Sequence, residues 1–399
     1  MKKADVFMKV SLFLTPFLLL SQPSDSRLLQ SNNTINTLTF TLHHKKNLPL
    51  PNVTTRNFVN PVSYHRQDSY YIRFFIGSPR KLFLLVIDTG SPYTWVRCNP
   101  CDDCSTSEYF DYQDSTSFSA VICASDRCPS KMCGEHLECP FQTGYEDGST
   151  TNGIWVADKF TLLKDDYATF VAMNDMRFGC ASHTDAVPHL DGVLGMSRGS
   201  LSLVSSLEVA YGFTQFSYCL NPNSTTALTF GESIDDTGLV IYTPLVAHPQ
   251  YYFVRLQGIT IGSESIESTD FPIEMALDSG STKSYFPTSL YNMLRDRYLG
   301  IVSALGWVRY YGSKETCYYA SPTEVDKLPL ANFRFDGDAN LNLKPDNIWI
   351  PLHEQTEVVC LAFGESTNHA PIFGNAQQKQ ILMIHDFGRS RIGFLPAGC

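Results

Sequence analysis

One short pattern occurs twice in this chain, and in both copies an aspartate ends an apolar run and a glycine follows two residues later. The copies are FLLVIDTGS at residues 83–91 and EMALDSGS at residues 274–281, which places Asp88 and Asp278 190 residues apart (278 − 88). Further along, each copy is followed by two apolar residues and a glycine, in GVLG and in PIFG. The shared order of parts indicates a duplicated lobe, so we expect two halves related by a pseudo-twofold axis.

The two aspartates suggest a specific chemistry if the halves face each other. A buried carboxylate without a partner is costly, but two carboxyls at close range share one proton because they cannot both ionise. The ionised member can then activate a water as general base, and the protonated member can bind a carbonyl oxygen. We therefore predict catalytic roles for Asp88 and Asp278, with Gly90 and Gly280 allowing tight turns because glycine has no Cβ. The scheme requires no metal, cofactor or covalent intermediate.

The rest of the chain reads as mainly β. Short runs rich in Val, Ile, Phe and Tyr are separated by Gly, Pro, Asn and Ser, and only residues 200–207 and 288–305 have a helical pattern. A length of 399 residues is enough for two domains or for one large all-β unit, with a sizeable core in either case. The formal net charge of −10 and the lack of a long Lys/Arg run argue against a nucleic-acid binder.

The N-terminus has the layout of a secretory signal peptide. Lysines at positions 2, 3 and 9 precede an apolar stretch at residues 10–20, which is too short for a membrane anchor of roughly 20 residues. We assign residues 1–23 to the signal and the polar, Pro/Asn-rich residues 24–65 to a propeptide. We expect a secreted, glycosylated protein without a membrane span, with a vacuolar destination left open. The expected glycosylation sites are the Asn-x-Ser/Thr sequons that begin at Asn32, Asn52 and Asn223.

Twelve cysteines in an oxidising compartment are expected to form disulfides. The stretch CNPCDDC at residues 98–104 has a spacing that could also suit half of a zinc site. No matching Cys/His group occurs elsewhere, so we favour disulfides and no metal.

These residues resemble those of the pepsin-like aspartic proteases, and among them the nepenthesin-type enzymes of plants. The resemblance runs from YYIRFFIGSP at residue 70 to the C-terminus and is most specific in DTGS, DSGS, YEDGS, LDGVLGMSRGSLSLVSSL and SRIGFLPAGC. The cysteine-dense block at residues 98–139 is its nepenthesin-like part. The resemblance implies a mainly β, bilobal fold with an active-site cleft between the lobes.

The resemblance also implies roles for further residues. Ser91 and Ser281 match hydroxyls that hydrogen-bond the outer oxygens of the two aspartates. Tyr145 matches the tyrosine of a mobile flap hairpin that closes over the substrate, and Trp95 matches the tryptophan behind it. Glu146 stands where the family usually has glycine, which could stiffen the flap or favour basic substrate side chains.

Six disulfide pairs are implied by the same resemblance, although cysteine spacing alone does not choose among the alternatives. They join Cys98 with Cys101, Cys104 with Cys180, Cys123 with Cys139, Cys128 with Cys133, Cys219 with Cys399, and Cys317 with Cys360.

A basic cluster in the propeptide offers cations that could cover the aspartates at neutral pH and be released as carboxylates protonate. Its members are His43, His44, Lys45 and Lys46.

Other interpretations remain open. Each aspartate could be an ordinary turn residue. The stretch GMSRG at 195–199 fits a serine-hydrolase elbow, with Asp278 and either His369 or His385 completing a triad, although the chain lacks the α/β alternation that this fold needs. Some secreted plant proteins of this type act as glycanase inhibitors instead of proteases.

We therefore predict a secreted aspartic endopeptidase with an N-terminal lobe at 66–243 and a C-terminal lobe at 244–399. It should act as a monomer, at acid pH, on extended peptides with apolar side chains, without a membrane or nucleic-acid partner.

Overall fold

β-Strands account for most of the secondary structure in the computed structural model. It describes residues 37–44, 69–101, 109–130, 133, 137–163, 170–186, 191–231, 238–352, 357–367, 370–396 and 398–399. Residues Asn36–Cys399 form one unit, and residues Met1–Ile35, with the predicted signal peptide, lie outside the described part. The mainly β prediction is confirmed.

The strands of the first half are β1 Leu38–His44, β2 Tyr70–Ile76, β3 Lys81–Asp88, β4 Trp95–Arg97, β5 Ser119–Ala120, β6 Pro140–Gly144, β7 Thr150–Leu163, β8 Phe170–Thr184, β9 Gly192–Gly195, β10 Gln215–Cys219, β11 Thr226–Phe230 and β12 Ile241–Pro244. The strands of the second half are β13 Phe253–Ile261, β14 Glu264–Ser265, β15 Ile273–Leu277, β16 Ser284–Pro287, β17 Val308–Tyr310, β18 Cys317–Tyr319, β19 Ala331–Phe335, β20 Ala339–Leu343, β21 Trp349–Pro351, β22 Val358–Leu361, β23 Phe363–Ser366, β24 Ile372–Phe373, β25 Ile381–Asp386 and β26 Arg391–Pro396. The helices are α1 Leu203–Tyr211, α2 Thr288–Ala304, α3 Pro322–Val325 and α4 Asn375–Gln378, with 3-10 turns η3 Tyr112–Asp114, η4 Asp336–Asp338 and η5 Pro345–Asn347.

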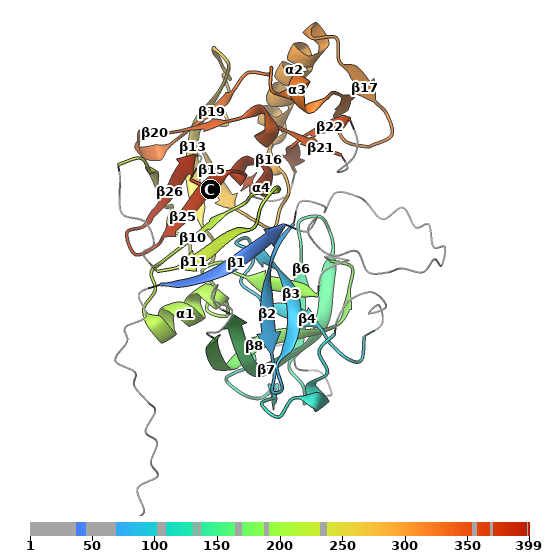
Figure 1. Ribbon diagram of the computed structural model, residues 1–399, viewed down its shortest axis with the longest axis vertical. Helices are drawn as coiled ribbons and strands as arrows, with labels where there is room; N and C mark the ends of the chain where they lie inside the picture. The colour runs from blue at the N-terminus through green and yellow to red at the C-terminus, as the bar shows by residue number, and fades with distance from the viewer. Residues whose placement is uncertain are drawn as a thin grey trace, which may run out of the picture. The chain divides into compact units, whose positions relative to one another are not determined.

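The strands form three sheets. A 14-stranded sheet has the order β12-β26-β25-β10-β11-β1-β2-β3-β9-β4-β8-β7-β5, with β6 paired to β7. An 8-stranded sheet has the order β20-β19-β13-β15-β24-β16-β23, with β14 paired to β13. A 4-stranded sheet, β17-β18-β22-β21, completes the second half. Because β12, β25 and β26 belong to the first sheet, that sheet joins sequence from both ends of the chain (Figure 1).

Both halves repeat one strand arrangement, as the sequence repeat predicted. In the first half β3 runs parallel to β9, β9 is antiparallel to β4, and β4 is parallel to β8. In the second half β15 runs parallel to β24, β24 is antiparallel to β16, and β16 is parallel to β23. GVLG is β9, and the last apolar residues of PIFG form β24. Each of these elements therefore lies beside a strand that leads into an aspartate.

The two long helices begin and end near the residues that the pattern predicted. Ser202 caps α1, since its hydroxyl accepts a hydrogen bond from the Ser205 amide, and Gly212 ends the helix in the left-handed region at φ 71°. Helix α2 buries Leu290, Leu294, Tyr298 and Val302, which recur every four residues and so share one face. Across the described residues, every helix is too short or too polar to cross a lipid bilayer.

Strand β1 comes from the segment that we assigned to the propeptide. It pairs antiparallel with β11 and with β2, and Figure 1 shows it between them. Leu38, Phe40 and Leu42 are buried, as expected when alternate residues of a strand face a core. His43 stacks on Tyr71 at 5.2 Å between ring centroids. The side chains of the other three members of the basic cluster lie outside the described residues.

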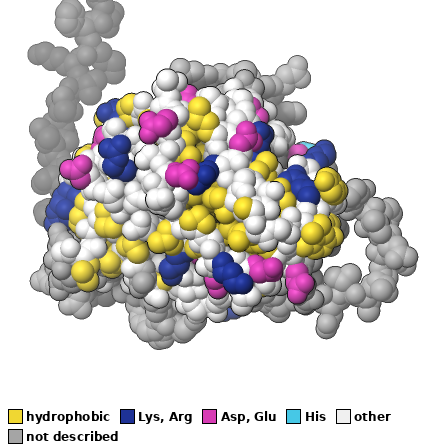
Figure 2. All heavy atoms as spheres, turned by 90° about the horizontal axis from the view of Figure 1, so that it is seen from above, with side chains coloured by type: hydrophobic (Ala, Val, Ile, Leu, Met, Phe, Trp, Pro, Cys, Tyr) yellow, Lys and Arg dark blue, Asp and Glu magenta, His cyan; other side chains and the backbone are white. Residues whose placement is uncertain are grey.

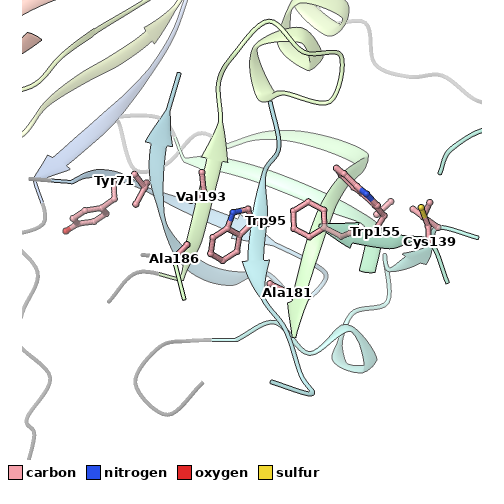
Figure 3. Packing of buried hydrophobic residues seen from close by; sticks show 11 residues of the cluster. Tyr71, Trp95, Cys139, Trp155, Ala181, Ala186 and Val193 are labelled. Carbon is pink, nitrogen blue, oxygen red and sulfur yellow. The ribbon is translucent and has the colours of Figure 1, made fainter. Parts of the chain in front are cut away.

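A cluster of buried residues fills the core beneath the 145–149 hairpin. It consists of Tyr71, Val86, Trp95, Val121, Cys139, Phe141, Trp155, Ala157, Ala181, Ala186 and Val193. Phe141 and Trp155 meet edge to face at 4.9 Å, the geometry that aromatic pairs prefer. Figure 3 shows Trp95 close to Val193 and Ala186. On the face seen in Figure 2, charged side chains of both signs are interspersed with apolar ones.

The disulfides differ in part from the implied pairs. The structure has Cys98–Cys180, Cys123–Cys133, Cys128–Cys139, Cys219–Cys399 and Cys317–Cys360. The last two are the pairs that the resemblance implied. Cys101 is also in a disulfide, whereas Cys104 lies outside the described residues. The implied pairs 98 with 101, 104 with 180, 123 with 139, and 128 with 133 are wrong.

Strand register explains the first of these corrections. Because β4 runs parallel to β8 with Val96 opposite Cys180, and the Cys98 amide donates to the Ala181 carbonyl at 2.9 Å, the two cysteines lie side by side. In the second group, the sulfurs of Cys123, Cys128 and Cys133 lie within 4.8 Å of one another. Several pairings are therefore sterically close there, and sequence spacing could not distinguish them. Oxidation of Cys98 also removes a thiolate that the zinc alternative would need.

Candidate active site

Asp88 is the last residue of β3 and lies at the start of a tight turn. The Ser91 hydroxyl donates to Asp88 Oδ2 at 2.6 Å, and the Gly90 amide donates to Oδ1 at 2.9 Å. Only 6% of the Asp88 surface is exposed. The apolar residues of β3 thus carry the carboxyl into the interior, and the turn that follows supplies its hydrogen-bond donors.

Asp278 follows β15 in the same arrangement. The Ser281 hydroxyl donates to Oδ2 at 2.7 Å, and the Gly280 and Ser281 amides donate to Oδ1 at 2.8 and 3.1 Å. Asp278 is half-buried and has three donors, whereas the more deeply buried Asp88 has two. The two sites are thus alike in chemistry and different in environment.

Thr89 and Ser279 lock the two turns together. The Thr89 amide donates to Ser279 Oγ at 3.1 Å, and the Ser279 amide donates to Thr89 Oγ1 at 2.9 Å. Each hydroxyl then donates to a carbonyl of the opposite strand, Thr89 to Leu277 and Ser279 to Ile87, both at 2.9 Å. All of these groups are buried. Both residues occupy the second position of their Asp-Ser/Thr-Gly-Ser strings, so their matching positions were a signal that the sequence reasoning did not use.

The two glycines let each aspartate approach the opposite turn. A Cβ on Gly90 would lie 2.5 Å from Asp278 Cγ, and one on Gly280 would lie 2.7 Å from Asp88 Oδ1. Neither space is available to any side chain, because real Cβ contacts are essentially never below 3.0 Å. The structure therefore brings together Asp88, Asp278 and the two glycines that the sequence repeat singled out.

The proximity of two carboxyls changes their proton affinity. Burial is the main reason that the pKa of Asp88 is raised well above its usual range, and the negative charge of Asp278 adds to it. The hydrogen bonds from Ser91 and Gly90 act in the opposite direction, because they favour the charged form. The pair of carboxyls thus retains one proton at a pH at which an isolated aspartate would be ionised.

Tyr145 and Trp95 lie together at the hairpin that joins β6 and β7. The indole Nε1 of Trp95 donates to the Tyr145 hydroxyl at 2.5 Å, and Trp95 is fully buried. The hairpin turn is closed by bonds between Tyr145 and the Gly148 and Ser149 backbone, with Gly148 at φ 83°. The Trp95 indole N–H therefore has the partner that a buried tryptophan needs.

Glu146 follows Tyr145 and is exposed at this hairpin. Burial raises the pKa of Tyr285, and among the charges that add to this effect are those of Asp278 and Glu146. Burial also raises the pKa of Tyr251, and the charges of Asp278 and Glu146 are again among those that add to this effect. The charges of Glu146 and Asp278 thus act on the same two tyrosines of the second half.

Two hollows are lined by residues other than the two aspartates. One of about 240 Å³ is lined by Tyr285, Tyr291 and the ion pair of Lys283 with Glu315. One of about 830 Å³ is lined by β8, α1 and residues 249–250, and neither aspartate contributes to its walls.

The serine-hydrolase alternative is not supported by the positions of its residues. Ser197 lies in the segment 196–202 that joins β9 to α1, but it is fully buried, and its hydroxyl accepts from the Gly199 amide at 3.4 Å. His385 lies beside the Tyr218 hydroxyl at 3.4 Å, and His369 is outside the described residues. Asn32 and Asn52 are also outside them, whereas Asn223 lies in an exposed turn after β10.

Comparison with known proteins places most of the described chain in one family. The family described as xylanase inhibitor N-terminal matches residues 70–232, and xylanase inhibitor C-terminal matches residues 251–396. Aspartic proteinase nepenthesin-2 of Nepenthes gracilis is 32% identical over 84% of this chain and 79% of its own length. Nepenthesin-1 of the same plant is 30% identical over 84% and 79%.

Solved structures support the same fold. Basic 7S globulin from soybean aligns with a TM-score of 0.69 at 17% identity, covering 90% of this chain and 94% of its own. Conglutin gamma from lupine seeds also aligns with a TM-score of 0.69, at 18% identity, over 90% and 94%. The sequence relatives, the bilobal fold and the paired Asp-Ser/Thr-Gly-Ser turns together show that the chain belongs to the pepsin-like aspartic protease family.

Proposed function

We propose that this protein is an aspartic endopeptidase that hydrolyses peptide bonds with a water activated between Asp88 and Asp278. The observation that carries the proposal is the close approach of the two carboxyls, each of which lies against the glycine of the opposite turn. Both turns keep the hydroxyl and amide donors that a working pair needs. The aspartic proteinase relatives support the same reaction class.

The geometry assigns different roles to the two carboxyls, one as general acid and one as general base. Burial favours the neutral form of Asp88, so the shared proton rests there in the free protein. Asp278, with three donors, is the ionised member and accepts a proton from the attacking water. The Asp88 proton stabilises the oxygen of the scissile carbonyl, and a proton returned from the pair allows the amine to leave.

The 145–149 hairpin is proposed to act as a flap over an extended peptide. Its tyrosine is held by the Trp95 indole, and the charge of Glu146 acts on Tyr251 and Tyr285 of the second half. Closure of such a hairpin excludes water and strengthens polar contacts with the transition state.

The remaining assignments from the sequence belong to the same proposal. Residues 1–23 act as a secretory signal, residues 24–65 as a propeptide, and residues 66–243 and 244–399 as two lobes of a secreted monomer. The disulfides are consistent with an oxidising compartment. Acid pH is the expected working range, because the pair must hold one proton.

Replacement of one carboxyl tests the enzyme directly. Asp88→Asn should lower kcat/KM on an unfolded protein or fluorogenic peptide at least about 1,000-fold at acid pH, because the proton relay is lost. Asp326→Asn, at an exposed aspartate after α3, is the matched control and should keep parental activity. A statine-containing transition-state mimic should block the parent. Full activity in Asp88→Asn would refute the mechanism.

A binding protein without protease activity is the second candidate. It is favoured by one observation, that the family matching both halves is described as xylanase inhibitor. The two candidates are separated by assaying the acid-treated, purified protein for proteolysis and for inhibition of a xylanase. Inhibition of the xylanase without proteolysis, and unchanged by Asp88→Asn, would favour the binder.

A further inference from the structure

A buried histidine lies between two tyrosines whose hydroxyls lead to the two catalytic turns. His385 on β25 has no exposed surface, and its ring is stacked on Phe216 at 4.4 Å with an interplanar angle of 9°. Tyr252 meets it edge to face at 4.5 Å, and the Tyr218 ring lies 5.5 Å away. Because Phe216 and His385 are direct partners in the β10–β25 ladder, strand register sets this arrangement.

The first tyrosine leads to Asp88. The Tyr252 hydroxyl donates to the Met196 carbonyl at 3.1 Å, and the Met196 amide donates to the Asp88 carbonyl at 2.8 Å. Met196 directly follows the GVLG element. The Tyr252 carbonyl also accepts from the Leu277 amide at 2.9 Å, so the same residue is tied to the strand that precedes Asp278.

The second tyrosine leads to Asp278. The Tyr218 hydroxyl donates to Gln378 Oε1 at 2.7 Å. The Gln378 amide nitrogen donates to the Phe373 carbonyl at 2.8 Å and to the Asp278 carbonyl at 3.4 Å. Gln378 ends the short helix that follows PIFG. Both connections therefore pass through a residue that follows an apolar-apolar-glycine element, one residue after it in the first half and four residues after it in the second.

The donors and acceptors around the Tyr218 hydroxyl place a proton on the Nε2 of His385. Tyr218 has one hydroxyl hydrogen, and that hydrogen is used in the short bond to Gln378. The Nε2 of His385, 3.4 Å from the Tyr218 oxygen, must then be the donor of that pair. The other ring nitrogen, Nδ1, has no hydrogen-bond partner among the described residues, which suits a neutral ring.

We propose that His385 is a positioning residue, which holds Tyr218 and Tyr252 so that both catalytic turns keep their relative placement. The inference rests on the proposed function for its kinetic consequence. The structural part of the inference, that the ring stabilises the two turns, does not depend on the proposed function. Transition-state stabilisation by two carboxyls depends steeply on their geometry, so a loosened support lowers the chemical step more than substrate binding.

Three single replacements test the proposal. His385→Phe keeps an aromatic ring for stacking but removes the Nε2 donor, and Tyr218→Phe removes the link to Gln378. His385→Gln restores an N–H donor and should recover part of what His385→Phe loses. Tyr298→Phe is the matched control, since Tyr298 is equally buried on α2 and its hydroxyl has no hydrogen-bond partner among the described residues.

Two measurements are made on each folded variant. With a fluorogenic peptide, kcat should fall about tenfold in His385→Phe and Tyr218→Phe while KM stays within twofold of the parent. By mass-detected hydrogen exchange, peptides covering residues 88–91 and 278–281 should exchange faster in both variants, with little change elsewhere. Tyr298→Phe should match the parent in both measurements.

The outcomes distinguish this inference from the proposed function. If the parent cleaves nothing, the proposed function fails, and exchange at the two turns alone decides the positioning role. If His385→Phe and Tyr218→Phe exchange at the turns as slowly as Tyr298→Phe does, the positioning role is refuted whether or not the parent is a protease. Loss of kcat without rescue by His385→Gln would refute the role of the Nε2 donor.

Discussion

At the scale of single residues, the site requires two positions that have no side chain. Gly90 and Gly280 occupy turns whose outer space is filled by the opposite carboxyl. Their φ angles are not in the left-handed region, so the constraint is close approach rather than backbone conformation. Any side chain at either position must displace an aspartate.

Gly280→Ala should therefore impair catalysis while the chain still folds. The new Cβ would meet Asp88 Oδ1 at 2.7 Å, and displacement by a few tenths of an ångström up to 1 Å should lower kcat about 100-fold. The measurement is steady-state kinetics with a fluorogenic peptide, after circular dichroism has shown a native spectrum.

Gly300→Ala provides the control for this change. Gly300 lies inside α2 with nothing within 4 Å of the added Cβ, so this variant should keep its activity and gain about 0.5–1 kcal/mol of stability. Parental kcat in Gly280→Ala would show that the carboxyls do not pack as described.

At the scale of elements, strand β1 occupies an unexpected place. The sequence assigned its residues to a removable propeptide, yet β1 connects β11 to β2 within the largest sheet. The alternation LTFTLHH was visible in the sequence, but its partner strands are far away along the chain, so only the folded sheet shows where it belongs.

Phe40→Ala tests how much β1 contributes to the free energy of unfolding, both in the precursor and in the processed form, from which the propeptide has been removed. Phe40 is buried and packs edge to face on Phe230 at 6.1 Å, so its loss should lower the free energy of unfolding of the precursor by about 3–5 kcal/mol. Urea denaturation of precursor and processed forms provides the measurement. If processing removes β1, the two processed forms should be equally stable.

Val209→Ala is a suitable comparison, because Val209 is 89% exposed on α1 and should tolerate the change in both forms. A precursor whose stability is unchanged by Phe40→Ala would contradict the packing of β1.

At the scale of the whole molecule, two buried groups act on folding stability with opposite dependence on pH. The raised pKa of Asp88 means that the folded chain keeps a proton that the unfolded chain releases, so this contribution to stability falls as pH rises. Burial lowers the pKa of His385 from 6.5 to about 3, so the unfolded chain binds a proton that the folded chain does not. That contribution falls as pH decreases below 6.5.

The difference between parent and His385→Phe isolates the histidine contribution. Between pH 6.5 and about 3 the parent should lose stability relative to the variant by up to about 1.4 kcal/mol per pH unit, the slope for one proton. Urea denaturation at several pH values measures the difference, and adding Asp88→Asn to both chains prevents self-digestion. Parallel curves across this range would show that His385 titrates normally.

Much of this protein could be read from its sequence because the decisive signals are local. Apolar alternation predicts short strands, and two Asp-Ser/Thr-Gly-Ser strings after such strands indicate a paired carboxyl site. Tyr145 and Trp95 were found through the family resemblance, and the structure joins them by a hydrogen bond.

The sequence by itself determined the mainly β class, the duplicated halves and the identity of the two aspartates, since each is encoded within a few consecutive residues. Tertiary structure alone decided that Cys98 pairs with Cys180, that β1 enters the sheet, and that His385 lies between Tyr218 and Tyr252. Those outcomes depend on the register of strands that are distant in the chain, and register follows from which faces are buried together rather than from local sequence.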